Sequence, residues 1–404
     1  MFKSIASLSK PLSCALLALS LHSFAVSPAT PVPGQVPAPG TTPKVAIPDA
    51  PQLAATGYIL IDGETGEVLA QNNADQRLPP ASLTKMMSSY LVIEELIRGR
   101  INETNMVNIS VKAWKMEGSR MYVREGTQVS VIDLLRGEII QSGNDATVAL
   151  AEYVGGNEDA FVDMMNKKAQ ELGMKSTHFQ NAAGLPAEGH YTTARDLAVL
   201  ARAVIYNHPQ HYPLYAEKEF KYNNIRQPNR NLLLYRDPTV DGLKTGHTEE
   251  AGYCLVASSK RDNTRLIAVV LGTKSDNSRA EETQKLLAYG FRYFETVGLY
   301  KANTEITKVR VWSGKTTEVE LGLPKDVRMT LPRGHVDEVK ANVHVNETIK
   351  APIAVGQELG SLTIELDGKV INTQPLVALQ PVEEANFFAR LWDKIKLFFR
   401  GLFS

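Results

Sequence analysis

The stretch Ser82-Leu83-Thr84-Lys85 decides which fold is predicted for this sequence of 404 residues. Two further motifs follow it in order, Ser142-Gly143-Asn144 and Lys244-Thr245-Gly246. Each motif alone is commonly structural: a helix-capping serine, a turn tripeptide, or a lysine in a β-hairpin. The three together, in this order, are typical of an active site that acylates a serine without a histidine.

The first motif places a nucleophile beside a base. Pro79-Pro80 blocks helix formation upstream, and residues 83–98 show one apolar face before Gly99. Ser82 is therefore expected at a helix N-terminus, where free N–H groups favour developing negative charge. Lys85 follows by three residues, so it lies on the same face, one turn away. A desolvated lysine there can lose its proton and act as the base that a serine hydroxyl needs.

The second and third motifs supply groups for the leaving amine and the substrate. Ser142 and Asn144 are expected in a short turn between helices, where a hydroxyl can relay a proton and an amide can hold a carbonyl. The third motif is predicted on an edge strand, followed by antiparallel strands at residues 253–257 and 265–271. Gly246 lets a substrate backbone approach, and Lys244 with the neighbouring threonines faces an anionic ligand.

On these motifs the chain resembles the low-molecular-mass penicillin-binding proteins, the serine-type D-alanyl-D-alanine carboxypeptidases. Residues 226–231, residues 241–248 and the tail Asn386-Phe387-Phe388 resemble the Gram-negative, membrane-attached branch of that family. The resemblance implies an α+β fold with a penicillin-binding-protein/β-lactamase-like catalytic domain, an antiparallel sheet with helices. A small all-β sandwich domain and a C-terminal amphipathic helix are expected to follow.

The resemblance also implies a role for each residue of the site. Ser82 is expected as nucleophile, Lys85 as general base and Ser142 as proton relay. The residues expected to bind substrate are Asn144, Lys244, Thr245, Gly246, His247, Thr248 and Arg279. Arg279 stands at the family's position for reading a terminal carboxylate, and the backbone N–H groups of Ser82 and His247 form the implied oxyanion hole.

The implied reaction removes the terminal D-alanine of a peptidoglycan pentapeptide through an acyl-enzyme on Ser82, and penicillins acylate the same serine. Two alternatives stay open. A β-lactamase shares the fold, but no glutamate-centred motif downstream would position a deacylating water. A non-enzymatic, membrane-tethered wall-binding protein would not need the intact Ser82 and Lys85. The expected partners are the peptidoglycan stem peptide, β-lactam antibiotics and the inner-membrane surface.

Composition argues against other classes of function. Basic and acidic residues balance at 44 each, so no basic face for nucleic acid is implied. The seven histidines after the signal segment show no metal-ligand spacing with acids or cysteines, apart from His208 and His211, which lie by Pro209 in a loop. No glycine-rich phosphate loop is present. We therefore expect neither a metal nor a cofactor. Cys254 falls in an apolar strand pattern and is expected to be buried.

The N-terminal segment predicts secretion. Lys3 and Lys10 precede an apolar run too short to span a bilayer, and Ser23-Phe24-Ala25 is a small-x-small cleavage site. The expected organisation is a signal peptide at 1–25 and a proline-rich leader at 26–51. A catalytic domain at 52–298, a β-rich domain at 299–383 and a terminal helix at 384–404 follow.

The last twenty residues predict an amphipathic helix that lies in a membrane surface. Its apolar face comprises Phe387, Phe388, Leu391, Trp392, Ile395, Phe398, Phe399, Leu402 and Phe403, and its basic residues are Arg390, Lys394, Lys396 and Arg400. With the signal segment, this predicts a periplasmic protein attached peripherally to the outer face of the inner membrane. The alternative is a helix docked as a core element on the β-rich domain.

Overall fold

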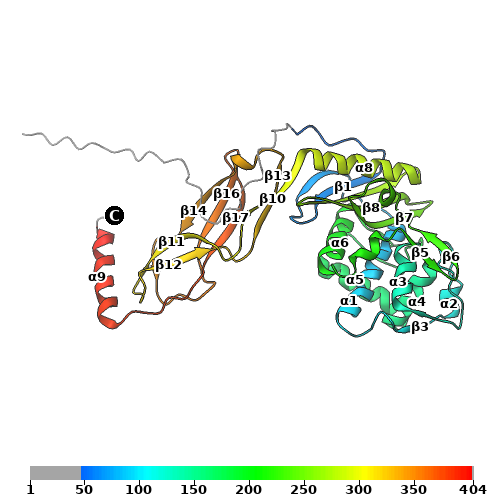
Figure 1. The fold of residues 1–404 in the computed structure, drawn as a ribbon, viewed down its shortest axis with the longest axis horizontal. Coiled ribbons are helices and arrows are strands. Elements are labelled where there is room, and N and C mark those ends of the chain that lie inside the picture. The colour runs from blue at the N-terminus through cyan, green and yellow to red at the C-terminus, as the bar shows by residue number, and fades with distance from the viewer. Residues whose placement is uncertain (1–46, 403–404) are drawn as a thin grey trace, which may run out of the picture.

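The computed structural model describes residues 47–402 (Figure 1). The predicted signal segment, most of the leader and Phe403 lie outside the described residues. Figure 1 shows three parts in chain order: a mixed helix and sheet part, a β-rich part, and the helix α9 (Phe387–Leu402) at the far end. This order confirms the predicted fold class.

A five-stranded antiparallel sheet forms the base of the first part, in the order β2-β1-β9-β8-β7. Its strands are β1 (Gly57–Asp62), β2 (Val68–Asn72), β7 (Val240–Thr248), β8 (Gly252–Arg261) and β9 (Thr264–Thr273). β1 and β2 pair as an antiparallel hairpin at the start of the domain. The third motif lies on β7, at the edge of the sheet as predicted, so one side of that strand is open to a ligand.

Alternate residues of the strands enter two different cores, because successive side chains of a strand point to opposite faces. On β9, Leu266, Ala268 and Val270 pack toward α8 (Asp276–Tyr293), whereas Ile267, Val269 and Leu271 pack toward the other helices. Figure 1 shows α8 on one face of the sheet and the helical bundle on the other. α8 begins at Asp276, since Ser275 caps it by accepting the N–H of Ser278.

The bundle contains both remaining motifs. Its longer helices are α1 (Lys85–Ile97), α3 (Val131–Ile139), α4 (Asn144–Gly155), α5 (Glu158–Leu172) and α6 (Ala194–Asn207). The shorter helical elements are η1 (Ala81–Thr84), α2 (Val111–Trp114), η2 (Tyr212–Ala216) and α7 (Leu233–Arg236). Two antiparallel strand pairs accompany them, β3 (Met106–Asn108) with β4 (Gln128–Ser130) and β5 (Glu219–Tyr222) with β6 (Ile225–Pro228). Ser142 and Gly143 of the second motif lie in the turn between α3 and α4, as predicted, whereas Asn144 is the first residue of α4.

The expectation of Ser82 at the N-terminus of an α-helix is wrong in detail. Ser82 lies in the 3₁₀ turn η1, and the α-helix begins only at Lys85. The backbone N–H of Lys85 donates to the carbonyl of Ser82, a bond across three residues, and the preceding Ala81 has a left-handed φ of +47°. The turn is therefore tighter than the helix that the sequence periodicity predicts.

The β-rich part has a core of its own, to which two sheets contribute. Strand β10 (Phe294–Tyr300) pairs with β13 (Val327–Pro332), and a six-stranded sheet has the order β14-β16-β17-β12-β11-β15. Its strands are β11 (Glu305–Trp312), β12 (Glu318–Gly322), β14 (Lys340–Val345), β15 (Ile349–Lys350), β16 (Glu358–Leu366) and β17 (Lys369–Ala378), with a 3₁₀ turn η3 (Val336–Glu338). β10 spans the expected domain boundary at 298/299.

Gly184 marks the closest approach between the bundle and the turn that contains Ser82. Its φ is +85°, and a Cβ there would lie 1.8 Å from the carbonyl oxygen of Ala81. We expect Gly184→Ala to lower the free energy of unfolding by roughly 3 kcal/mol or more, from backbone strain plus the displaced turn. Gly156→Ala is the matched control, because Gly156 has φ +78° with no atom within 4 Å of the added Cβ.

The control should lose only about 1 to 2 kcal/mol, the cost of a left-handed alanine. Urea unfolding of both variants measures the difference. Equal losses would show that the turn yields to the added methyl group, and that Gly184 is required only for its φ.

Candidate active site

Ser82 and Lys85 are hydrogen-bonded to one another. The Nζ atom of Lys85 lies 3.0 Å from the Oγ atom of Ser82. Lys85 is only 1% exposed, and its Nζ also donates to Asn144 Oδ1 at 2.7 Å and to the carbonyl of Ala183 at 2.6 Å. Burial lowers the pKa of Lys85 to about 7, so a large fraction of this amine is neutral and basic near neutral pH.

The second motif brings a free hydroxyl to the same place. Ser142 is buried, has a left-handed φ of +63°, and its Oγ has no hydrogen-bond partner among the described residues. Asn144 is held from both sides, because its Oδ1 accepts from Lys85 and its Nδ2 donates to the carbonyl of Glu117 at 2.6 Å. The amide therefore orients the lysine, while the serine hydroxyl remains available to a substrate.

Asp145, which directly follows the motif, holds the loop that forms one wall of the site. Its carboxylate accepts the backbone N–H groups of Met121, Tyr122 and Val123 at 2.9, 2.8 and 3.1 Å. The side chain is 1% exposed. A Cβ on Gly143 would lie 2.8 Å from this carboxylate, which explains the glycine of the motif. The sequence analysis did not identify Asp145; its place in the first turn of α4 was the available signal.

The strand that carries the third motif packs directly on the turn that carries Ser82. A Cβ on Gly246 would lie 3.2 to 3.3 Å from atoms of Leu83 and Ala81, so glycine permits this contact. Lys244 is 2% exposed, and its Nζ donates to the carbonyl of Thr245 at 3.1 Å. Burial holds the pKa of Lys244 well below its usual range.

Arg279 reaches the site from α8. Its guanidinium is 6% exposed, donates to the carbonyl of Gly246 at 3.2 Å and forms an ion pair with Asp276. It also lies 5.6 Å from the centre of the Tyr253 ring. Arg230, which the sequence analysis did not single out, brings a second guanidinium to the same cavity. Burial lowers the pKa of both arginines from their ordinary values.

A cavity of about 930 Å³ joins these groups. Eight of the ten predicted site residues line it: Ser82, Ser142, Asn144, Thr245, Gly246, His247, Thr248 and Arg279. The other two, Lys85 and Lys244, are buried beside it and have their ammonium groups near its wall. The cavity brings together a serine hydroxyl bonded to a buried lysine, an unpartnered hydroxyl and two guanidinium groups. This arrangement suits acyl transfer from a substrate that carries a carboxylate.

Glu138 is a third residue of the site that was not predicted from the sequence, after Asp145 and Arg230. It is fully buried on α3, and neither of its carboxylate oxygens has a hydrogen-bond partner within residues 47–402. Burial raises its pKa to about 8, and the nearby positive charges of Lys85 and Lys244 oppose that rise. The signal was a glutamate inside the apolar run that leads to Ser142.

Two further expectations concern cysteine and metal. Cys254 is buried with a pKa raised to about 11 by desolvation, as expected of a core thiol. In the part of the chain that the structure describes, no group of three or more His, Cys, Asp or Glu residues is placed to hold a metal ion.

The comparisons with known proteins cover both parts of the chain. Residues 44–275 match the D-alanyl-D-alanine carboxypeptidase family model, and residues 294–384 match that of the penicillin-binding protein 5 C-terminal domain. The chain is 46% identical to the D-alanyl-D-alanine carboxypeptidase DacA of Escherichia coli K12, over 89% of this chain and 92% of that one. It is also 46% identical to DacC of the same organism, over 88% and 91%. The crystal structure of penicillin-binding protein 5 from Haemophilus influenzae superposes with a TM-score of 0.79 at 44% identity, covering 85% of this chain and 100% of that one.

Glu138→Gln is expected to move the pH profile of Ser82 acylation toward lower pH. We expect neutral Lys85 to accept the proton of Ser82, so acylation should rise with pH through the Lys85 pKa of about 7. The Glu138 charge raises that pKa, and removing it lets Lys85 lose its proton at lower pH. The rate of labelling by a fluorescent penicillin between pH 5 and 9 gives the profile; the increase should appear near pH 8, where Glu138 begins to carry its charge, and should vanish by pH 6, where Glu138 is protonated.

Glu125→Gln, which changes an exposed glutamate, should leave the profile in place. An unchanged midpoint in Glu138→Gln would show that Glu138 stays protonated throughout and exerts no charge on Lys85.

Proposed function

Because the chain belongs to the D-alanyl-D-alanine carboxypeptidase family, we propose that Ser82 is the residue on which it forms its acyl-enzyme. The enzyme removes the terminal D-alanine from peptidoglycan pentapeptide. The observation that carries the assignment of Ser82 is its hydrogen bond to a buried lysine, 3.0 Å long, at the wall of a cavity that also contains Arg279.

The proposed steps use only groups placed at this cavity. Neutral Lys85 accepts the proton of Ser82 as Oγ attacks the carbonyl carbon of the penultimate D-alanine. The negative charge that develops on the carbonyl oxygen is received by the backbone N–H groups of Ser82 and His247. The proton then passes through the unpartnered hydroxyl of Ser142 to the leaving amine. Water, deprotonated by the same lysine, hydrolyses the ester and restores Ser82.

Two kinds of contact recognise the substrate in this proposal: charged side chains bind its carboxylate, and backbone groups bind its peptide chain. The terminal carboxylate pairs with the guanidinium of Arg279 and the hydroxyls of Thr245 and Thr248. The open edge of β7 offers its backbone groups to the extended peptide, which adds to the sheet as a further strand. Lys244 contributes positive potential beneath the same site, and Asn144 holds the peptide carbonyl. β-Lactams bind here because their strained amide and their carboxylate are placed relative to one another as the scissile amide and the terminal carboxylate of the peptide are.

The comparisons favour this function over the two alternatives. The curated relatives that match over most of the chain are named carboxypeptidases, and none of those described above is named a β-lactamase. A wall-binding protein without catalysis would not need the Lys85–Ser82 hydrogen bond, which is intact.

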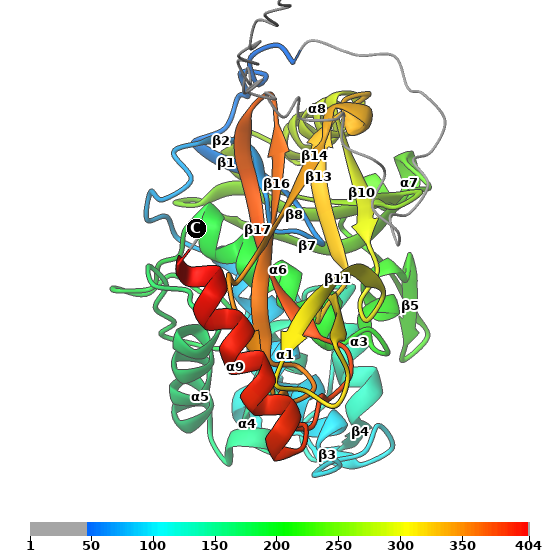
Figure 2. The same ribbon diagram turned by 90° about the vertical axis from the view of Figure 1, so that its left-hand side faces the viewer.

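We also propose that α9 attaches the enzyme to the outer face of the inner membrane. Its apolar side chains are uncovered: Phe388 is 79% exposed, Trp392 59% and Phe398 67%. Asp393 alone on this helix is acidic, and it accepts the backbone N–H of Ser313, which ties the helix to the β-rich part. Figures 1 and 2 show α9 lying across the end of the molecule, with its axis transverse to the long direction.

That orientation fits a helix lying in an interface, with the β-rich residues 299–383 as a spacer to the catalytic residues 52–298. No helix within residues 47–402 is long and apolar enough to cross a membrane. The proposed secretion signal at 1–25 places the catalytic part in the periplasm.

Ser82→Ala is expected to abolish both D-alanine release and covalent penicillin labelling, since no other group supplies the nucleophile. Lys85→Ala should lower acylation by about 10²- to 10⁴-fold, the usual contribution of a positioned base. Lys115→Ala, an exposed lysine, is the control and should leave both activities unchanged. Intact-protein mass after incubation with penicillin measures the adduct. An adduct on the Ser82→Ala protein would assign the nucleophile elsewhere.

Truncation before Asn386 is expected to release the enzyme from membranes while activity on small soluble peptides survives. Each large apolar side chain inserted in the interface contributes at most about 1.5 to 3 kcal/mol, and each basic residue about 1 kcal/mol near anionic lipid. Sedimentation with anionic vesicles measures the binding. The double variant Phe388→Ser with Trp392→Ser keeps the helix length and should bind more weakly than the intact chain. A truncated protein that still sediments, or that unfolds, would contradict an anchoring role for α9.

A further inference from the structure

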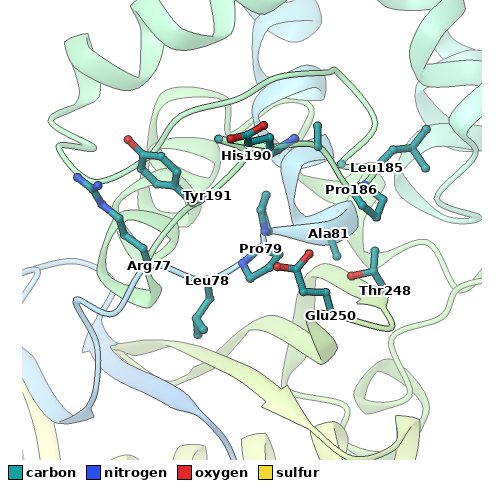
Figure 3. Close-up of a pocket in the computed structure, with 15 residues that line it drawn as sticks. Arg77, Leu78, Pro79, Ala81, Leu185, Pro186, His190, Tyr191, Thr248 and Glu250 are labelled. Carbon is teal, nitrogen blue, oxygen red and sulfur yellow. The ribbon is translucent and has the colours of Figure 1, made fainter.

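Two cavities near the active site differ in their relation to it. The first, of about 540 Å³, is drawn in Figure 3 and shares Gly184, Leu185 and Thr248 with the active-site cavity, so it continues that site. The second, of about 320 Å³, shares no lining residue with the active-site cavity. We call the second one the outer cavity, and the function proposed above does not use it.

One loop contributes both to the outer cavity and to the active site. Gly118 and Ser119 line the active-site cavity, whereas Arg120 and Tyr122 line the outer cavity. The start of β6 completes the outer cavity, and the same segment then continues to Arg230 in the active site. A ligand in the outer cavity therefore contacts segments that form the active site without entering the active site itself.

Three apolar side chains line the outer cavity and remain exposed. Trp114 is 39% exposed, Tyr122 46% and Ile225 40%. Trp114 is also the only tryptophan in residues 52–298. Single exposed apolar side chains are common on soluble proteins, whereas a group of them at one cavity marks a binding surface. A flat, partly exposed aromatic ring suits a ligand ring with an apolar face and polar edges, such as a pyranose sugar.

The charge at the outer cavity is entirely positive. Arg120 and Arg124 line it, and no acidic side chain does. Both arginines are exposed, and neither forms an ion pair or a side-chain hydrogen bond within residues 47–402. The guanidinium of Arg120 lies 5.4 Å from the centre of the Tyr122 ring, which orients it over the same surface. Two unpaired guanidinium groups beside aromatic rings are suited to a carboxylate carried by the ligand.

The backbone that presents Tyr122 is held in a strained conformation. Tyr122 has a left-handed φ of +69°, which a bulky residue adopts only under constraint. Its carbonyl accepts from Asn223 Nδ2 at 3.2 Å, and the carbonyl of Met121 accepts from the buried Gln227 Nε2 at 3.0 Å. Asp145 accepts the N–H groups of the same two loop residues. The surface is therefore preformed, which lowers the cost of ordering it on binding.

The position of the outer cavity indicates what reaches it. Figure 1 places α2, which ends at Trp114, and the β5–β6 hairpin at the end of the molecule opposite α9. With α9 on the membrane, the outer cavity faces away from lipid and toward the polymer that contains the substrate. Peptidoglycan is a chain of N-acetylated amino sugars that carries carboxylates on its lactyl groups or on its stem peptides. These two features match the aromatic and the cationic lining.

We propose that the outer cavity binds a glycan segment of peptidoglycan, separate from the stem peptide at Ser82. An amino-sugar ring packs on Trp114 and Tyr122, and Arg120 and Arg124 bind a carboxylate that the glycan carries. The inference rests on the proposed function for the identity of the polymer, but its contacts do not involve Ser82. Such binding keeps the enzyme on the polymer between the cleavage of one stem peptide and the next.

Calorimetric titration of the full-length enzyme with three oligosaccharides, none of which contains D-Ala-D-Ala, tests the site. The first is the tetrasaccharide of alternating N-acetylglucosamine and N-acetylmuramic acid with free lactyl carboxylates. The second carries L-Ala-D-isoglutamate on each lactyl group, and the third is neutral chitotetraose. The tighter of the two charged oligosaccharides should bind about tenfold more tightly than chitotetraose, because each exposed guanidinium–carboxylate pair contributes at most about fivefold. The comparison of the first two identifies the source of the carboxylate.

Variants assign the contacts. Trp114→Ala should weaken all three oligosaccharides by about tenfold, through the lost ring packing. Arg120→Ala should weaken the charged ones by about fivefold and leave chitotetraose unchanged.

Two matched controls should bind as the unaltered enzyme does. Arg292 is exposed, lies 5.6 Å from the centre of the Tyr293 ring and forms no ion pair in the described part of the chain, so Arg292→Ala is the control for Arg120. Tyr153, 37% exposed and outside the cavity, gives Tyr153→Ala as the control for Trp114. The rate of penicillin acylation is measured for every protein and reports on Ser82 and on folding.

The outcomes separate this inference from the proposed function. No binding of any oligosaccharide, with normal penicillin acylation, would overturn the glycan site and leave the carboxypeptidase assignment standing. Binding that excess penicillin abolishes would place the ligand in the active-site cavity, and equal affinity for all three oligosaccharides would exclude recognition of a carboxylate; either result overturns the inference. Absence of penicillin acylation in the unaltered enzyme would instead overturn the role of Ser82.

Discussion

Lys85 joins three segments of the chain, because each supplies one acceptor to its Nζ atom: the turn that carries Ser82, the start of α4, and the loop at Ala183. An ammonium group this deeply buried costs free energy unless it is fully hydrogen-bonded, and the same burial lowers the pKa of Lys85 to about 7, so that much of the amine is neutral and can accept a proton near pH 7. The burial of Lys85 therefore has two effects. Its hydrogen bonds join these segments, and the exclusion of water from its amine sets the chemistry of the site.

Close backbone packing explains why water stays out. Gly184 allows the carbonyl of Ala81 to lie against the bundle loop, and Gly246 allows the edge strand to lie against Leu83. Larger residues at either position would separate the strand, the turn and the loop, and water would then reach Lys85. The left-handed Ala81 and Ser142 store backbone strain at the same junction, on either side of the lysine. Strain and burial are both tolerated because the two large cores on the faces of the sheet supply the stability.

The three motifs, through the family resemblance that they carry, were sufficient to predict which side chains meet at the site. Other features depend on contacts between distant segments. Ser82 lies in a 3₁₀ turn on which Gly184 and Gly246 pack closely. The local periodicity of the sequence does not indicate these contacts. Glu138 has the spacing of any helical glutamate, and only the packing of α3 makes it a buried neighbour of Lys85. Strand β10 follows α8 without a turn signal, and its partner β13 lies about thirty residues further on.

The connection between the catalytic and β-rich parts depends on a buried carboxylate. Asp62, fully buried, accepts the hydroxyl of Thr296 on β10 and also the backbone N–H groups of Glu64 and Thr65 in the turn after β1. That turn in turn contacts β13, through the Thr65–Thr330 hydroxyl pair at 2.6 Å and the Glu64–Arg328 ion pair at 3.1 Å. Exposed pairs alone contribute little, whereas a buried, multiply bonded carboxylate restricts the geometry strongly. A spacer fixed in this way at one end, and tied through Ser313 and Asp393 to a transverse helix at the other, sets the height of the cavity above any surface on which α9 lies.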